Sequence, residues 1–185
     1  MSKNIKSVCV FCGSRPGVRD SYQVAARQFG ASLAREGWRL VYGAGDVGLM
    51  GEVARATRES GGTVFGVIPK HLTDLEIVLD DIDSLVVTET MHERKKVMFM
   101  NSDAIVALPG GAGTLDELFE AITWRQLGLH DKPVTLLDVD GYWSGVLDVM
   151  DGVIECGFAD PSLRTLFSVE ETVESLVASL RKDLT

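Results

Sequence analysis

The chain has 185 residues, enough for a sizeable core, so residues 1–185 are expected to form a single domain. Its 45% hydrophobic and 24% charged residues are typical of a globular protein, and the formal net charge of −9 argues against nucleic acid as a partner. No apolar run reaches the ~20 residues that span a bilayer, and the run after the charged start is too short for a signal peptide, so we expect a cytoplasmic protein that does not bind membranes.

Short β-branched runs alternate with helical patterns along the chain. Strands are predicted over 7–12, 39–42, 63–68, 85–88, 104–108 and 134–137. Helices are predicted over about 49–60, about 91–101 and 142–156. Three further helices are predicted because apolar residues recur at helical spacing: Tyr22, Ala26, Phe29 and Leu33 in the first, Leu115, Leu118, Phe119 and Ile122 in the second, and Val173, Leu176, Val177 and Leu180 in the third. Ser168 and Glu171 have capping-box spacing before the last helix. The strict alternation predicts an α/β fold, a Rossmann-like doubly wound parallel sheet with helices on both faces.

This architecture also predicts where a ligand binds, because ligands of open α/β sheets lie at the carboxyl ends of the strands. Gly13 and Ser14 follow the first predicted strand, Gly43 and Gly45 follow the second, and 109–114 follow the fifth. Glycines expose backbone N–H groups and let a ligand approach closely. These segments are therefore the candidate pocket.

The strongest single motif is PGGAGTLDE over 109–117, between a predicted buried strand and an amphipathic helix. Three glycines in four positions permit a nest of amides at a helix N-terminus, which binds phosphate, and Thr114 adds a hydroxyl donor. The alternative is an ordinary turn in which Thr114 and Glu117 form a capping box. A capping box does not explain Gly110, Gly111 and Gly113 together, so the motif favours phosphate binding.

A second motif is the basic run Arg94, Lys95 and Lys96 in an otherwise acidic chain. It falls in the first turns of a predicted helix, where the helix dipole disfavours cations. For Arg94 and Lys95 this placement indicates an anionic partner, whereas Lys96 fits a solvated face. His92 and Glu93 begin like a zinc-protease HExxH motif, but the required second histidine is absent.

Other short patterns are weaker indications of function. Gly43, Gly45 and Gly48 form a GxGxxG after a strand, but the acidic residue that a dinucleotide site needs about 20 positions on is missing. Cys9 and Cys12 form a CxxC whose members point to opposite faces of a strand, so we interpret them as buried thiols. Cys156 is also expected to be buried. No metal and no cofactor are expected.

Several segments together resemble one known family. These are the PGGxGTxxE signature at 109–117, a companion helix motif ending in Arg-Lys at 91–95, TWRQLG at 123–128, Lys-Pro at 132–133 and DGYW at 140–143. The chain resembles the LONELY GUY (LOG) family of cytokinin riboside 5′-monophosphate phosphoribohydrolases over about residues 8–167. Such chains were formerly described as lysine decarboxylases. No lysine in a sequence context typical of pyridoxal phosphate binding is evident here.

The resemblance implies a nucleotide-binding Rossmann-like fold, a homodimer, and hydrolysis of N6-substituted adenosine 5′-monophosphates to the free base and ribose 5-phosphate without a metal. Carried over by position, Arg94 and Glu117 are the catalytic pair. Substrate contacts fall on Glu76, Lys95, Gly110, Gly111, Ala112, Gly113, Thr114, Leu115, Asp116 and Thr123; Gly13, Ser14, Gly43, Gly45 and Met91 complete the expected pocket. One departure is Ala44, where many relatives have a third consecutive glycine and where a Cβ is expected to border the ligand.

Cleavage of an N-glycosidic bond builds positive charge on the sugar, which a carboxylate such as Glu117 stabilises. Alternatives stay open at this point. They are a broader nucleoside 5′-monophosphate nucleosidase, a non-enzymatic carrier of a nucleotide or of the molybdenum cofactor, and a decarboxylase that uses pyridoxal phosphate.

Overall fold

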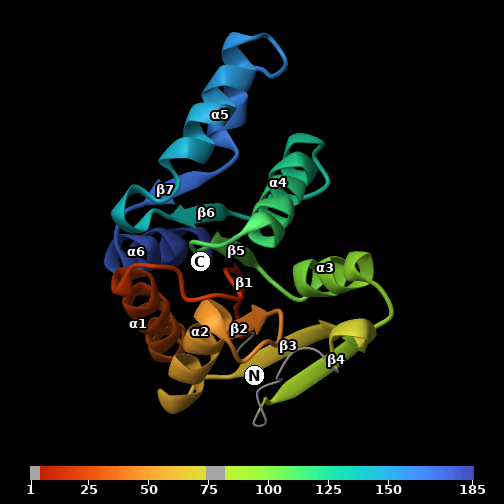
Figure 1. Cartoon of the computed structure of the whole chain (residues 1–185), viewed down its shortest axis with the longest axis vertical. Coiled ribbons are helices and arrows are strands. Elements are labelled where there is room, and N and C mark those ends of the chain that lie inside the picture. The colour runs from red at the N-terminus through yellow and green to blue at the C-terminus, as the bar shows by residue number, and fades with distance from the viewer. Residues whose placement is uncertain (1–4, 74–81) are drawn as a thin grey trace.

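The computed structural model describes residues 5–73 and 82–185, which form a parallel sheet flanked by helices (Figure 1). The strand order is β4-β3-β2-β1-β5-β6-β7, and every neighbouring pair runs parallel. The strands are β1 (Ser7–Phe11), β2 (Arg39–Tyr42), β3 (Val64–Pro69), β4 (Ser84–Thr88), β5 (Ala104–Ala107), β6 (Val134–Leu137) and β7 (Ser168–Glu170). The predicted doubly wound parallel sheet is confirmed.

Helices cover both faces of the sheet, and each face has its own hydrophobic core. One core contains Phe29 of α1, Val53 of α2 and Leu176 of α6, and the other contains Met98 of α3 and Leu118 of α4. In Figure 1, α1, α2 and α6 lie on one side of the sheet, and α3 and α4 lie on the other. The helices are α1 (Asp20–Glu36), α2 (Gly48–Glu59), α3 (Met91–Met100), α4 (Ala112–Gln126), α5 (Ser144–Glu155) and α6 (Val173–Asp183).

The alternation of side chains along β1 explains why its apolar run is continuous. Val8 and Val10 pack in the first core, and Cys9 and Phe11 pack in the second, so every residue of the strand is buried. Cys12 returns to the first core. The two thiols therefore point to opposite faces, as predicted.

The central crevice lies between β1 and β5. From β1 the chain passes through α1 to β2 on one face, and from β5 it passes through α4 to β6 on the other. The two connections diverge at the carboxyl ends of these neighbouring strands, which is the topological switch point where open α/β sheets bind ligands. The segments after β1 and β5 are those that carry the predicted glycines.

Three sequence predictions are wrong in the C-terminal third. Ser168 begins β7, where its hydroxyl lies 2.9 Å from that of Thr135, and the cap of α6 is instead Thr172, which accepts a hydrogen bond from the Ser175 amide. The helix predicted from position 142 begins at Ser144, after a short 3-10 turn (Val139–Gly141). Cys156 is exposed because it caps the outer end of α5.

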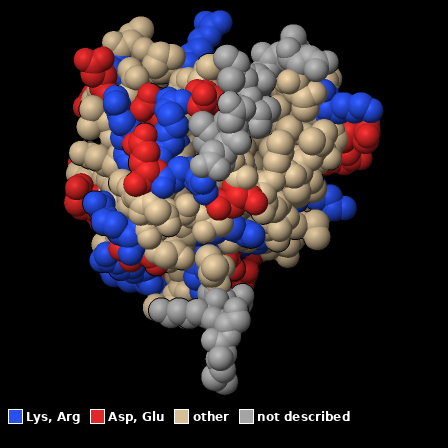
Figure 2. Space-filling model, turned by 90° about the horizontal axis from the view of Figure 1, so that it is seen from below, with Lys and Arg blue, Asp and Glu red and all other residues tan. Residues whose placement is uncertain are grey.

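On the face in Figure 2, Lys and Arg side chains are interspersed with Asp and Glu side chains rather than gathered into one basic patch. Among the residues that the structure describes, no helix is long and apolar enough to cross a membrane.

Candidate functional site

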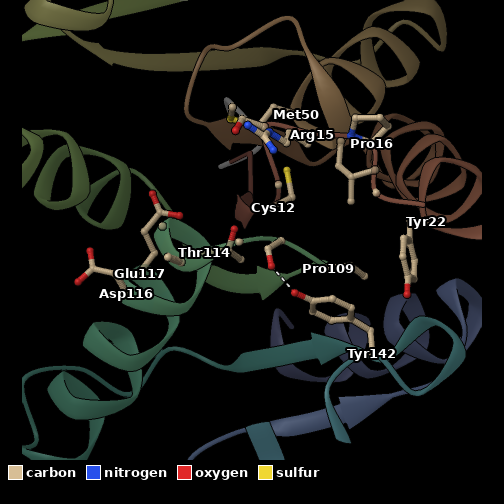
Figure 3. A pocket seen from close by; sticks show the side chains of 18 of the residues that line it. Cys12, Arg15, Pro16, Tyr22, Met50, Pro109, Thr114, Asp116, Glu117 and Tyr142 are labelled. Carbon is tan, nitrogen blue, oxygen red and sulfur yellow. Dashed lines mark hydrogen bonds between the residues drawn. The ribbon is translucent and has the colours of Figure 1, made fainter. Parts of the chain in front are cut away.

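A cavity of about 490 Å³ opens at the carboxyl ends of β1 and β5. Figure 3 shows Tyr22 and Tyr142 toward one end, Asp116 and Glu117 toward the other, and Thr114 between them. The lining comes from the turns after β1 and β5, the first turns of α1, α2, α3 and α4, and the end of the β6–α5 connection. The lining residues are Cys12, Gly13, Ser14, Arg15, Pro16, Gly17, Tyr22, Leu49, Met50, Met91, Arg94, Pro109, Gly110, Gly111, Ala112, Gly113, Thr114, Asp116, Glu117 and Tyr142.

The N-terminus of α4 faces this cavity without a cap. The helix begins at Ala112 after Gly111, and its first backbone bond runs from the Leu115 amide to the Gly111 carbonyl at 3.1 Å. No described residue accepts a hydrogen bond from the amides of Ala112, Gly113 or Thr114. Free amides at the positive end of a helix dipole form an anion site.

The alternative capping box at Thr114 and Glu117 is wrong. Because α4 starts at Ala112, Thr114 lies inside the first turn and is too late to be the cap. Its side chain is buried, lines the cavity and makes no hydrogen bond within the described part of the chain. The Thr114 hydroxyl is therefore available to a ligand.

The glycines of the turn have different roles. A Cβ on Gly110 would lie 2.1 Å from Oγ1 of Thr114 and 2.8 Å from the amide nitrogen of Gly13, so only glycine fits where the turns after β1 and β5 meet. The Gly13 amide also donates to the Pro109 carbonyl at 3.0 Å. A Cβ on Gly111 or Gly113 would meet no atom within 4 Å, because both face open space.

Glu117 lies one helical turn beyond Thr114, on the same side of α4. Within the described residues, nothing donates a hydrogen bond or forms an ion pair to its carboxylate. Burial raises the pKa of Glu117 from 4.5 to about 7, against the opposing effect of the Arg94 charge. The cavity therefore contains a carboxyl group that changes charge near neutral pH.

Arg94 is fixed by the sheet below it. Its Nε donates to the Val67 carbonyl at 3.2 Å and its Nη2 to the Gly43 carbonyl at 2.9 Å. The helix start is set by Thr90 and Glu93, which form a capping box at the beginning of α3. The bonds from Arg94 to the two carbonyls, with a 3.9 Å contact from its Nη1 to Sδ of Met91, use only part of the five N–H groups of the guanidinium, so donors remain for a group in the cavity. No ion pair joins Arg94 directly to Glu117 in the described structure.

Lys95, next to Arg94, has a different environment. Its ammonium lies 3.0 Å from Oδ2 of Asp116 and 2.9 Å from Oε2 of Glu120, both on α4. Lys95 is buried and is absent from the cavity lining. The anionic partners of Lys95 in the structure are therefore two carboxylates of the protein itself.

The structure brings most of the predicted site residues together, and it places some elsewhere. Gly13, Ser14, Met91, Arg94, Gly110, Gly111, Ala112, Gly113, Thr114, Asp116 and Glu117 line the cavity. Gly43 and Gly45 are buried behind it, Leu115 packs against the second core, and Thr123 is exposed farther along α4. Glu76 lies outside the described residues. A Cβ on Gly43 would fall 1.7 Å from Nη2 of Arg94, so this glycine makes room for Arg94.

Ala44 does not border the cavity. Its side chain is fully buried in the first core, where its methyl group packs close to Gly66. It adopts a left-handed conformation with φ 65°, which is unfavourable for a residue with a Cβ. The expected crowding of a ligand at this position is absent.

Sequence reasoning missed several lining residues: Cys12, Pro16, Tyr22, Met50 and Tyr142. Tyr142 donates a hydrogen bond to the Gly110 carbonyl and packs edge-on against Tyr22, with ring centroids 5.8 Å apart (Figure 3). The signal for Tyr142 was its place in the DGYW segment. In the described part of the chain, no group of three or more His, Cys, Asp or Glu residues is arranged to hold a metal ion.

A family model described as "possible lysine decarboxylase" matches residues 50–180. A cytokinin riboside 5′-monophosphate phosphoribohydrolase of Arabidopsis thaliana is 46% identical over 180 residues, which cover 97% of this chain and 79% of the relative. A protein of Oryza sativa subsp. japonica, described as a probable cytokinin riboside 5′-monophosphate phosphoribohydrolase, is 49% identical over 177 residues, covering 96% and 78%.

Among solved structures, the chain is similar to the Moco carrier protein of Chlamydomonas reinhardtii. The TM-score is 0.75 at 25% identity, and the match covers 98% of each chain. The fold is therefore shared with a carrier as well as, by sequence, with hydrolases.

Proposed function

Because this chain belongs to the LONELY GUY family of phosphoribohydrolases, we propose that it hydrolyses the N-glycosidic bond of adenosine 5′-monophosphates, including those with an N6 substituent. The products are the free base, a cytokinin where the substituent is prenyl, and ribose 5-phosphate. The observation that supports this most directly is that one cavity holds both the uncapped first turn of α4 and the carboxyl group of Glu117.

The phosphate of the substrate binds at the N-terminus of α4. The free amides of Ala112, Gly113 and Thr114, with the Thr114 hydroxyl, supply donors, and the helix dipole favours the negative charge. Anchoring the phosphate fixes the sugar beside the next turn of the helix, and such fixed orientation lowers a barrier by on the order of 7–11 kcal/mol at most. A nucleoside without phosphate loses this anchor.

In the reaction, water adds to C1′ of the ribose while the bond from C1′ to the base nitrogen breaks. The bonding electrons leave with the base, which takes up a proton, and the attacking water loses one. Positive charge builds on the ribose as the bond breaks. The ionised carboxylate of Glu117 stabilises that charge, and the absence of any other described partner leaves both its oxygens free for the sugar and the water.

Arg94 stabilises the negative charge that develops on the departing base. Two backbone carbonyls hold its guanidinium, so it is fixed before substrate arrives and needs no reorganisation during the reaction. Its remaining donors stabilise the electron pair that departs with the base. Its positive charge also favours the ionised form of Glu117.

We also propose that the protein is cytoplasmic and, as the family resemblance implies, a homodimer. Phe119 on α4 is 39% exposed, and Leu127 and Leu129, just after the end of this helix, are each 67% exposed. Apolar side chains exposed in one region are typical of association surfaces. Sedimentation at micromolar concentration tests this, and a stable monomer would contradict it.

The function is tested by incubating the purified protein with a panel of nucleoside 5′-monophosphates and with adenosine, and measuring released base. We expect base from AMP or N6-prenyl-AMP and almost none from adenosine. Equal turnover of AMP and adenosine would contradict the role of the phosphate. Tight binding of AMP without any release of base would instead favour the carrier function suggested by the similar fold of the Moco carrier protein.

A further inference from the structure

The only described hydrogen bonds between α3 and α4 are made by Lys95. Its ammonium bridges Asp116 and Glu120, at 3.0 and 2.9 Å, and these two residues flank Glu117 in the sequence. On α3, Lys95 directly follows Arg94. The buried ammonium of Lys95 therefore links the part of α3 that contains Arg94 to the part of α4 that contains Glu117.

The same two helices also touch farther from the cavity. There, Phe99 of α3 and Trp124 of α4 pack edge-on with ring centroids 5.1 Å apart. This contact is apolar and lies away from the cavity lining. It provides a comparison, because weakening it loosens the two helices without removing a charge near Glu117.

Charged groups of both signs surround Glu117. The charged groups that act on it are Arg94 and Lys95 from α3 and Asp116 and Glu120 from its own helix, and the buried thiol of Cys9 on β1 and that of Cys12 just after it also face this region, where Glu117 raises their pKa. Burial raises the pKa of Glu117, Asp116 and Glu120 raise it further, and Arg94 and Lys95 lower it. Although burial disfavours the ammonium of Lys95, its hydrogen bonds to Glu120 and Asp116 outweigh this and raise its pKa, so it stays charged.

Resting on the proposed hydrolysis, we propose that Lys95 is a positioning residue that holds Glu117 opposite Arg94 and neutralises Asp116 and Glu120, rather than a residue that binds substrate. Removing its charge leaves two carboxylates uncompensated beside Glu117. The ionised form of Glu117 then becomes harder to reach, and turnover at neutral pH falls. Phosphate binding is unaffected because the α4 amides do not depend on Lys95.

The test compares Lys95→Met with Lys95→Arg and with Trp124→Leu, using AMP turnover across pH. For Lys95→Met we expect kcat at pH 7 to fall about tenfold, KM to change less than about threefold, and the acidic limb of the kcat profile to move up by about one pH unit. Lys95→Arg restores the wild-type limb. Trp124→Leu lowers thermal stability and leaves the limb in place. A rise in KM with an unmoved limb would overturn the proposal and make Lys95 a substrate contact.

A double variant separates the remaining outcomes. In Lys95→Met/Glu120→Gln, one uncompensated carboxylate is gone, so the limb returns toward the wild-type position; no return would overturn the proposal. If Lys95→Met fails to fold, this double variant carries the test, because it leaves no unpaired charge at Glu120. If the wild type releases no base, the proposed function fails alone. The Glu117 titration followed by carboxyl NMR then decides about Lys95, and an unshifted titration in Lys95→Met would overturn its role.

Discussion

The Gly43 carbonyl and the Arg94 guanidinium are joined by a hydrogen bond of 2.9 Å that crosses from the end of β2 to the start of α3. Gly43 lies outside the cavity lining, yet a Cβ there would fall 1.7 Å from Nη2 of Arg94. The glycine is therefore a steric requirement of the site, acting through Arg94.

We expect Gly43→Ala to displace Arg94 and to lower kcat for AMP by about a hundredfold, because small displacements of catalytic groups have effects of this size. The matched control is Gly152→Ala in α5, where a Cβ meets no atom within 4 Å. That substitution should leave turnover unchanged and raise thermal stability slightly. Normal turnover in a folded Gly43→Ala protein would show that Arg94 is not needed in its observed place.

Thr114→Val tests the phosphate site. The substitution keeps the size of a buried side chain and removes the one hydroxyl in the first turn of α4 that faces the cavity. We expect kcat/KM for AMP to fall about tenfold, the cost of one hydrogen bond to a charged group. Inhibition by adenosine, which has no phosphate, should be unchanged. An equal loss for both ligands would place the phosphate elsewhere.

Activity should survive EDTA. The chain has only three histidines, His71, His92 and His130, and none has a ligand spacing with cysteines or carboxylates. Turnover of AMP is measured before and after dialysis against the chelator. Loss of turnover that one added divalent metal restores would contradict a metal-independent reaction.

Much of the fold and of the candidate site could be predicted from the sequence, because the patterns that indicate them lie within short segments. The alternation of strands and helices predicted the doubly wound sheet, and the PGGAGTLDE run predicted a phosphate turn next to Glu117. The three-residue strand β7 escaped detection because it is too short for periodicity to show. The partners of Lys95 depend on how α3 approaches α4, and the Tyr142–Gly110 hydrogen bond depends on how the β6–α5 connection folds over the glycine turn. Such contacts have no signature within a short segment.

Glu117 should lower stability at high pH. Its pKa in the folded protein, about 7, lies above its ordinary value of 4.5, so between these values the folded state holds a proton that the unfolded state has lost. Stability therefore falls as pH rises through this window, by an amount on the order of 3 kcal/mol at most, and the loss is complete above about pH 7. Glu117→Gln should remove this dependence.

The measurement is thermal melting of wild type and Glu117→Gln from pH 4 to 8. The variant should melt higher than wild type at pH 8 and equally near pH 4, where both side chains are neutral. A variant that is less stable at pH 8 would mean that the ionised carboxylate is stabilised by the fold.

The most direct test of the central claim is the turnover of AMP by Glu117→Gln. Glutamine keeps the shape of the side chain and removes its charge, and α4 does not rely on Glu117 for capping. The account predicts a folded protein that still binds AMP through the α4 amides and whose kcat is lower by about a hundredfold or more. The wild-type kcat should rise with pH through about 7, the pKa of Glu117. A folded Glu117→Gln protein with near-normal kcat would contradict the account.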